Sequence, residues 1–316
     1  MPPAGPVSLR QRMACMTTPS LATPSGQPDP RVIMGHPRRT IPADASGEEG
    51  CDVTETAKRE GRMRRFHEKF MVEERVVVGS GKRNLYIVAG VLFVAGLTGF
   101  FITLDSILEA DDLSFIDAPV ELWLDSGRDE WLTTLMIVLS IVFGPIAMPI
   151  IILITTVAWG VLAKHAWRPI LLAGGMILGV ILVQLLAPII ARDRPPADEM
   201  MIGYDPTSSF PSGHVMGVAD FLFIGTYLVF SRHRRPVITT LAFIAASVIV
   251  LLTAACRIYL GYHYATDAVG SIFLSLVVLG IVIAVDTWRT VRTGTPEEAA
   301  AVESGDETIG SEEAAR

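Results

Sequence analysis

The chain has 316 residues, half of them hydrophobic, and a mean hydropathy of +0.45. Its apolar residues form long runs with the charged residues between them, a pattern that excludes a soluble globular protein and indicates an integral membrane protein. The formal net charge of -7 is unevenly spread, because the segment before the first apolar run is basic whereas residues 105–130 are strongly acidic. The three cysteines lie far apart and form no CxxC pair, so we expect neither a disulfide framework nor a zinc site.

The two ends of the chain differ in composition from its middle. Residues 1–83 begin with a stretch rich in Pro, Ser, Thr and Gly that lacks the apolar core of a signal peptide, so we expect a disordered, basic extension that is not cleaved. Within it, residues 56–77 fit a helix on an anionic membrane surface and a solvated linker helix equally well, and Met63 is an alternative start. Residues 289–316 predict an acidic disordered tail, which leaves residues 84–288 as the membrane domain.

Six apolar runs are long enough to cross the bilayer. They cover residues 84–104, 146–163, 168–190, 212–230, 237–255 and 264–287. Residues 131–143 are too few to span alone, and Gly144, Pro145 and Pro149 interrupt the apolar stretch that continues from them, so we expect a lead-in that is tilted or lies near the interface. The predicted fold class is all-α integral membrane, a six-transmembrane-helix bundle with disordered termini.

Two features inside these runs predict how the helices pack. Gly175 and Gly179 form a GxxxG pattern on which another helix packs closely. Asp220 is costly in hydrocarbon, so we expect its side chain to face the interior of the bundle. Its carboxyl group then either makes a packing hydrogen bond or handles substrate or protons, and the sequence leaves both roles open.

An even number of crossings places both termini on one side of the membrane. The basic groups around Lys82, Lys164 and Arg232 then share one face, whereas the acidic residues 105–130 lie on the other. By the positive-inside rule the basic face is cytoplasmic. We therefore expect a multi-pass protein of the plasma (inner) membrane with both termini cytoplasmic.

A polar motif, Phe210-Pro211-Ser212-Gly213-His214, leads into the fourth run. Proline suits the first turn of a helix, where its missing N–H costs nothing. Ser212 and Gly213 would place a hydroxyl and unobstructed backbone N–H groups at the positive end of the helix dipole, which favours a bound phosphate. His214 adds a proton donor beside that anion.

Two further polar segments face outward in this topology, as the motif does. Arg192 and Arg194 follow the third run, and Arg257, His263 and Asp267 lie between the fifth and sixth. Asp267, four residues after His263, would accept the Nδ1 proton and leave Nε2 to attack phosphorus, without a metal or a cofactor. The predicted site has His263, His214 and Asp267 as catalytic residues and Arg194, Ser212, Gly213, Arg257 and Arg192 as phosphate ligands.

In these residues the chain resembles the type 2 phosphatidic acid phosphatase superfamily, which includes lipid phosphate phosphatases and polyprenyl diphosphate phosphatases. The pattern of that family is K-x6-R-P, then P-S-G-H, then S-R-x5-H-x3-D, and the resemblance covers about residues 84–288. It implies six helices, a site facing away from the cytoplasm, and catalysis through a phosphohistidine at His263, with Asp267 as its orienter and His214 as the acid.

Two positions depart from the family pattern. Cys256 replaces the motif serine, and Ala187 replaces the motif lysine. The candidates to replace that lysine are Arg192 for its charge and Gln184 for a hydrogen bond, and the alternative role of Arg192 is to pair with Asp193 or a lipid headgroup. The resemblance implies a metal-independent phosphatase that hydrolyses a lipid phosphate or diphosphate, polyprenyl or glycerolipid, at the extracytoplasmic face. Two alternatives stay open: a phosphotransferase to an acceptor other than water, and a catalytically silent phospholipid-binding member. The expected partners are the lipid substrate and membrane lipids, with no nucleic acid, and no oligomeric state is predicted.

Overall fold

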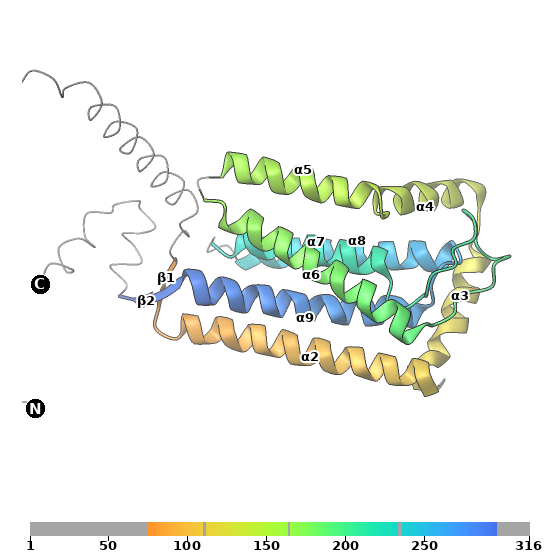
Figure 1. Cartoon of the computed structure of the whole chain (residues 1–316), viewed down its shortest axis with the longest axis horizontal. Coiled ribbons are helices and arrows are strands. Elements are labelled where there is room, and N and C mark those ends of the chain that lie inside the picture. Colours follow the sequence, from red (N-terminus) through yellow and green to blue (C-terminus); the bar gives the residue numbers. More distant parts are fainter. Residues whose placement is uncertain (1–74, 110–111, 164, 233–235, 296–316) are drawn as a thin grey trace, which may run out of the picture. The chain divides into compact units, whose positions relative to one another are not determined.

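The computed structural model of this chain describes residues 75–109, 112–163, 165–232 and 236–295, so the predictions for residues 1–74 and 296–316 lie outside the described residues. The elements run in chain order along the described part (Figure 1). They are β1 (Arg75–Val78), α2 (Gly81–Glu109), η1 (Asp112–Ile116), α3 (Asp117–Ser126), α4 (Glu130–Val142), α5 (Ala147–Leu162), α6 (Trp167–Ile190), α7 (Gly213–Phe230), α8 (Pro236–Tyr259), α9 (Ala265–Thr290) and β2 (Val291–Gly294).

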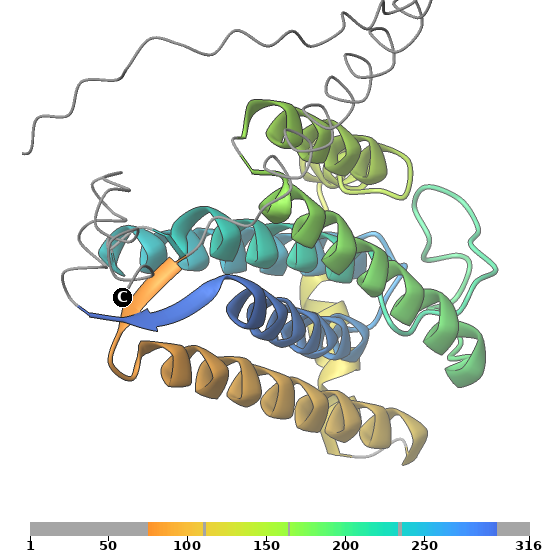
Figure 2. The same ribbon diagram turned by 60° about the vertical axis from the view of Figure 1, so that its left-hand side comes forward.

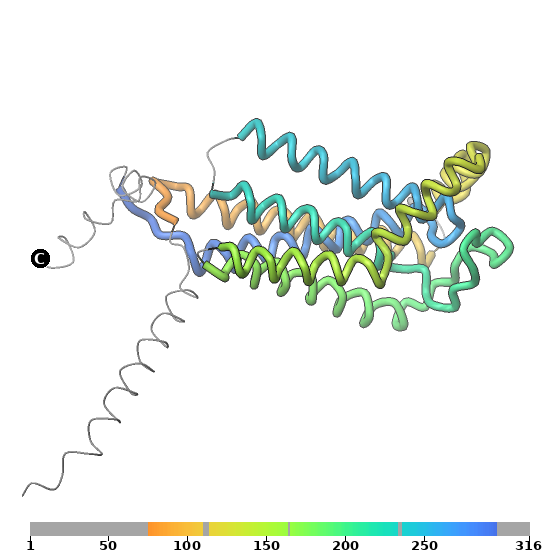
Figure 3. The backbone as a smooth tube through the Cα atoms, turned by 90° about the horizontal axis from the view of Figure 1, so that it is seen from above, coloured from red at the N-terminus to blue at the C-terminus, as the bar shows by residue number. Residues whose placement is uncertain are grey.

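Five helices in the described part of the chain are each long and apolar enough to cross a membrane: α2, α6, α7, α8 and α9. Helices α4 and α5 reach this length only as a pair, which is bent by 50° at its junction (Figure 3). The junction contains Gly144 and Pro145, as the sequence predicted, and Pro149 occupies the first turn of α5, where its missing N–H costs nothing. The predicted break in this apolar stretch is therefore confirmed, whereas the prediction that residues 146–163 cross alone is wrong, because α5 has 16 residues and reaches the length of a span only together with α4.

A two-stranded parallel sheet joins the flanks of the helical region. Arg75 of β1 lies opposite Val291 of β2, and Val78 lies opposite Gly294. Because β1 precedes α2 and β2 directly follows α9, the first and last helices have their outer ends at the same end of the bundle (Figure 2). Only an even number of crossings produces this arrangement, so the bent pair counts as one crossing and the described helices make six. The predicted six-helix membrane bundle is confirmed.

The prediction that the flanks of the membrane domain are disordered is wrong close to the bundle. The segment before α2 contains three successive valines, which favour extended structure, and it forms β1 rather than part of a helix or linker. Helix α9 continues to Thr290 and passes directly into β2. The two strands satisfy each other's backbone groups, which explains why order extends beyond the predicted boundaries at residues 84 and 288.

The GxxxG pattern marks the contact between α6 and α7, as predicted. A β-carbon at Gly175 would lie 2.5 Å from Cδ1 of Ile224, and one at Gly179 would collide with Oδ2 of Asp220. Asp220 is fully buried and accepts a hydrogen bond from the hydroxyl of Ser275 on α9 at 2.7 Å. The prediction that Asp220 faces the bundle interior is therefore confirmed, and its carboxyl group ties α7 to α9.

The two ends of the bundle differ in what they carry. The sheet lies at one end, and α3, the loop after α6 and the turn between α8 and α9 lie at the other, on the right in Figure 1. Helix α8 extends to Tyr259, four residues beyond the predicted end of its run, so Arg257 lies on its last turn. All the predicted site residues belong to this second end or to the helix turns next to it.

Candidate active site

The Phe210–His214 motif forms the entry into α7. Ser212 is the N-cap residue and Gly213 the first residue of the helix, whereas Pro211 lies before the cap after a cis peptide bond. The prediction that this proline begins the helix is wrong, because the extended backbone of Ser212 still belongs to the loop. The Ser212 N–H donates a hydrogen bond to Oγ of Ser271 at 2.7 Å. Its own hydroxyl is buried and has no partner among the described residues, so it is available to a ligand.

His263 and Asp267 meet at the start of α9. Helix α9 begins at Ala265, so Asp267 lies in its first turn and His263 precedes the helix. The two side chains are nevertheless adjacent, with Nδ1 of His263 3.4 Å from Oδ2 of Asp267, and the same Oδ2 accepts the Tyr264 N–H at 2.9 Å. Burial lowers the pKa of His263, and Asp267 opposes this shift. The imidazole is therefore neutral at neutral pH.

Arg194 brings a cation to Nε2 of His263. Its Nη1 lies 3.4 Å from Nε2 and donates a hydrogen bond to the carbonyl of Tyr262 at 2.7 Å. A guanidinium can only donate, so this contact places the lone pair on Nε2 and the ring proton on Nδ1, facing Asp267. The rest of the guanidinium fixes the loop after α6, through the Thr207 carbonyl at 2.9 Å and an ion pair with Asp205 at 2.9 Å. The result is an unprotonated nitrogen beside a group that binds anions.

Arg257 is held from two sides at the end of α8. The residue is 5% exposed, its Nη1 donates to Oγ of Ser140 on α4 at 2.6 Å, and its guanidinium lies 4.4 Å from the centre of the Tyr262 ring. Its Nε is buried without a hydrogen-bond partner among the described residues. A buried cation with one unused donor is a suitable ligand for a phosphate oxygen.

His214, the third predicted catalytic residue, lies on the first turn of α7. Its side chain interacts electrostatically with Arg257, His263 and Arg194, which places it within the same cluster. Its Nε2 also lies against the junction of α4 and α5, 3.6 Å from where a β-carbon of Gly144 would stand. The three predicted segments and the bend in the second crossing therefore converge at one end of the bundle.

The side chain of Arg192 has different partners from that of Arg194. Its Nη1 donates hydrogen bonds to Oδ1 of Asp267 and, at 2.8 Å, to the hydroxyl of Thr266. Its Nη2 pairs with Oδ2 of Asp117 at 2.8 Å, and the guanidinium lies 4.5 Å from the centre of the Tyr264 ring. We predicted a phosphate ligand and a substitute for the motif lysine, but here both terminal nitrogens are engaged by carboxylates, which attract a guanidinium strongly.

Several residues that contact the site were not predicted from the sequence, among them Ser140, Ser271 and Asp117. Ser271 follows Asp267 by four residues in α9, so helical periodicity would have found it. Ser140 and Asp117 come from distant segments and carry no local signal. Asp117 in particular is one of many acidic residues between positions 105 and 130, and only the folded chain distinguishes it.

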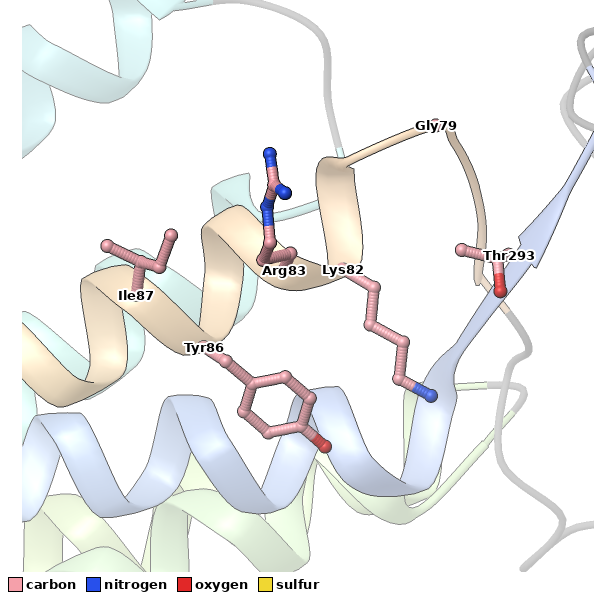
Figure 4. Close-up of a pocket in the computed structure, with 6 residues that line it drawn as sticks. All are labelled: Gly79, Lys82, Arg83, Tyr86, Ile87 and Thr293. Carbon is pink, nitrogen blue, oxygen red and sulfur yellow. The ribbon is translucent and has the colours of Figure 1, made fainter.

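Two surface hollows differ in their chemistry. One of about 460 Å³ adjoins Arg194 and is lined by Ala187, Pro188, the loop residues 191–197, Met200 and residues 204–208, so the position of the motif lysine opens onto it. The other, of about 550 Å³, lies at the sheet end and is lined by Gly79, Lys82, Arg83, Tyr86, Ile87 and Thr293 (Figure 4). This second hollow has no histidine or carboxylate in its lining, so it is not a candidate for acid–base catalysis.

Among the described residues, no group of three His, Cys, Asp or Glu side chains is arranged to hold a metal ion.

Comparison with known proteins identifies a family for this arrangement. Residues 168–290 match the family model described as PAP2 superfamily. Phosphatidylglycerophosphatase B of Bacillus subtilis is 27% identical over 192 residues, which cover 58% of this chain and 89% of that protein. The crystal structure of a transmembrane PAP2-type phosphatidylglycerolphosphate phosphatase from Bacillus subtilis superposes with a TM-score of 0.54 and 23% identity, over 61% of this chain and 96% of that chain. At this identity the structural likeness shows the fold, with its membrane helices.

Proposed function

Because the chain belongs to the PAP2 superfamily, we propose that it is a membrane phosphatase that hydrolyses a lipid phosphate or diphosphate without a metal ion. One observation carries this proposal: Nε2 of His263, which bears the lone pair, lies 3.4 Å from a guanidinium nitrogen of Arg194, within a cluster that also contains His214 and Arg257. A nucleophile beside two cations and a second imidazole suits phosphoryl transfer.

The first chemical step forms a bond between His263 and phosphorus. Nε2 attacks the phosphorus of the bound phosphate while the bond from phosphorus to the leaving oxygen breaks, and His214 donates a proton to that oxygen. A lipid monophosphate then leaves as an alcohol, and a lipid diphosphate leaves as a lipid monophosphate. Asp267 faces the Nδ1 proton and stabilises the positive charge that develops on the ring. Arg194, Arg257, the Ser212 hydroxyl and the Gly213 N–H would bind the equatorial oxygens.

The second step returns the enzyme to its starting state. His214, now neutral, takes a proton from a water molecule whose oxygen attacks the phosphorus. The bond from phosphorus to Nε2 breaks, and inorganic phosphate leaves with the lone pair restored to His263. The deep burial of His263, which is 3% exposed, limits the number of water molecules that reach the intermediate.

The substrate we propose is a lipid whose phosphate lies at the membrane surface, either a glycerolipid or a polyprenyl phosphate. The Bacillus relative is named for phosphatidylglycerophosphate, a glycerolipid phosphate monoester. The outer faces of the helices support a lipid substrate, because large apolar side chains such as Ile87, Val91 and Val94 are exposed along α2. Acyl or prenyl chains would remain in the bilayer while the phosphate enters the site.

We propose that the site faces away from the cytoplasm of a plasma (inner) membrane, since the sheet end of the bundle carries Lys82, Arg83 and Arg232. A cysteine placed at the exposed end of α3 tests this orientation in cells that express the protein without its native cysteines. A membrane-impermeant maleimide should label Ser126→Cys from outside and leave Lys82→Cys unlabelled until the membrane is permeabilised. The reverse pattern would place the site in the cytoplasm.

The activity is tested with purified protein in detergent on a panel of lipid phosphates that differ in headgroup and chain. We expect release of inorganic phosphate from at least one of them, and a fall of at least about a thousandfold in kcat for His263→Ala, because the nucleophile is removed. His165→Ala is the matched control, since His165 lies between α5 and α6 and takes no part in the chemistry. Equal phosphate release by the wild type and His263→Ala would contradict the proposal, and a phosphorylated acceptor in place of inorganic phosphate would identify a phosphotransferase.

A further inference from the structure

We propose that Arg192 and Asp117 are positioning residues that set the charge and orientation of the His263–Asp267 pair, and that Arg192 does not bind the substrate phosphate. This inference rests on the proposed role of His263 as nucleophile. It assigns a function to one residue of the acidic segment 105–130, for which the sequence predicted only a place outside the cytoplasm.

A continuous set of contacts joins Asp117 to the catalytic pair. Oδ1 of Asp117 accepts the backbone N–H of Thr266 at 2.8 Å, and Oδ2 accepts the hydroxyl of the same residue at 2.8 Å. Oδ2 also pairs with Nη2 of Arg192, whose Nη1 donates to Oδ1 of Asp267. Asp117 therefore binds the start of α9 directly and, through Arg192, the carboxylate that faces His263.

Burial makes this set of contacts rigid and electrostatically effective. Thr266 and Asp267 are 0% exposed and Asp117 is 7% exposed, whereas the side chain of Arg192 is 15% exposed. Charges that water does not reach interact more strongly than charges at the surface. The two oxygens of Asp267 have different partners, because Oδ1 binds Arg192 while Oδ2 binds the Tyr264 N–H and faces His263. This division fixes the plane of the carboxylate against the imidazole.

The contacts also determine how much negative charge His263 experiences. Asp267 alone would stabilise the imidazolium form, which lacks a lone pair on Nε2 and cannot attack phosphorus. The guanidinium of Arg192 neutralises part of that charge, and Asp117 in turn neutralises part of the guanidinium. The pair of residues thereby balances two requirements, a neutral imidazole in the resting enzyme and stabilisation of positive charge during transfer.

The groups that face His263 come from every neighbouring element. They are Asp267 on α9, Arg194 and Asp205 on the loop after α6, His214 on α7 and Arg257 on α8. None of these side chains is altered by substitution of Arg192 or Asp117, and Arg192 contacts Asp267 directly. A change in the titration of His263 in such variants therefore reports the proposed contacts.

The test compares Arg192→Gln with Asp117→Asn, because the proposal predicts opposite effects on one titration. Arg192→Gln removes a positive charge, so the pKa of His263 rises and the acidic limb of kcat/KM moves to higher pH by about one unit. Asp117→Asn removes a negative charge and leaves Arg192 to Asp267 alone, so the acidic limb moves to lower pH. In both variants kcat should fall roughly ten- to a hundredfold while KM changes little.

Two further variants separate positioning from a general loss of stability. Arg232→Gln removes a comparable pair at the sheet end, where Arg232 binds both oxygens of the 0% exposed Asp286 at 3.1 and 3.0 Å. It should lower the melting temperature without moving the pH profile. Arg192→Lys keeps the charge but cannot hold both carboxylates in a fixed geometry, so it should restore the pH profile while kcat remains reduced.

NMR titration of isotopically labelled histidine gives the same answer without an activity assay, because it measures the pKa of His263 in each variant directly. A raised pKa in Arg192→Gln and a lowered pKa in Asp117→Asn support the proposed control of the charge on His263, and both are measured independently of phosphatase activity. A rise in KM for Arg192→Gln with no shift in either titration would overturn it and make Arg192 a phosphate ligand. If Arg192→Gln does not fold, the direction of the shift in Asp117→Asn decides alone.

Discussion

Two neighbouring arginines at the site end differ in the side chains that they contact. Arg194 and Arg192 are two residues apart, yet one reaches Nε2 of His263 and the other binds Asp267 and Asp117. This leaves the motif lysine, absent at Ala187, without a cationic substitute at the end of α6. The hollow of about 460 Å³ that Ala187 lines is the space in which a longer side chain would lie.

A lysine introduced at this position should increase activity. Ala187→Lys would place an ammonium group beside Arg194, and a charge-assisted contact to the transferring phosphoryl group contributes about 2 kcal/mol or more to lowering the barrier. We expect kcat/KM on a lipid phosphate to rise at least tenfold, as measured by phosphate release. Ala187→Met, which fills the same space without charge, is the control and should give no gain. A loss of activity with lysine alone would mean that the hollow holds an uncharged part of the substrate.

At the scale of elements, the sequence predicted most of the membrane helices because their apolar runs are long and their interruptions contain Gly and Pro. The bend between α4 and α5 followed from Gly144 and Pro145, and the contact of α6 with α7 followed from Gly175 and Gly179. The sheet of β1 and β2 was missed, because two strands of four residues at opposite ends of the chain carry no local signal of their pairing. Pairing of this kind depends on the bundle having brought its ends together.

The candidate site shows the same division between local and non-local information. The three motifs identified the side chains that converge, because the chemistry of phosphate binding restricts residue types and spacing. The predicted start of the last run at residue 264 lies within one residue of the start of α9 at Ala265, whereas the ion pairs of Arg192 with Asp117 and Asp267 were not predicted. Ion pairs between distant segments depend on tertiary packing, and an acidic residue such as Asp117 resembles its neighbours until the chain folds.

For the whole molecule, the contacts that join the two ends of the described chain and the residues of the candidate site lie at opposite ends of the bundle. At one end, β1 pairs with β2 and Arg232 forms a buried ion pair with Asp286. The other end carries His214 and His263. The bend in the second crossing brings Gly144 to His214 and Ser140 to Arg257, so this irregular crossing shapes the site rather than only spanning the membrane. In the proposed reaction the lipid chains stay outside the helices, and only the phosphate enters the polar end.

The central claim is that His263 carries the phosphoryl group during turnover, and trapping that group tests it most directly. The purified protein, mixed for milliseconds with a radiolabelled lipid phosphate and quenched in alkali, should contain label in the peptide that includes His263, bound in the acid-labile and alkali-stable manner of a phosphohistidine. His263→Ala should contain none, and His214→Ala should retain label for longer, because the base for the attacking water is missing. Phosphate release without any label on His263, in a sample that turns over, would contradict the account.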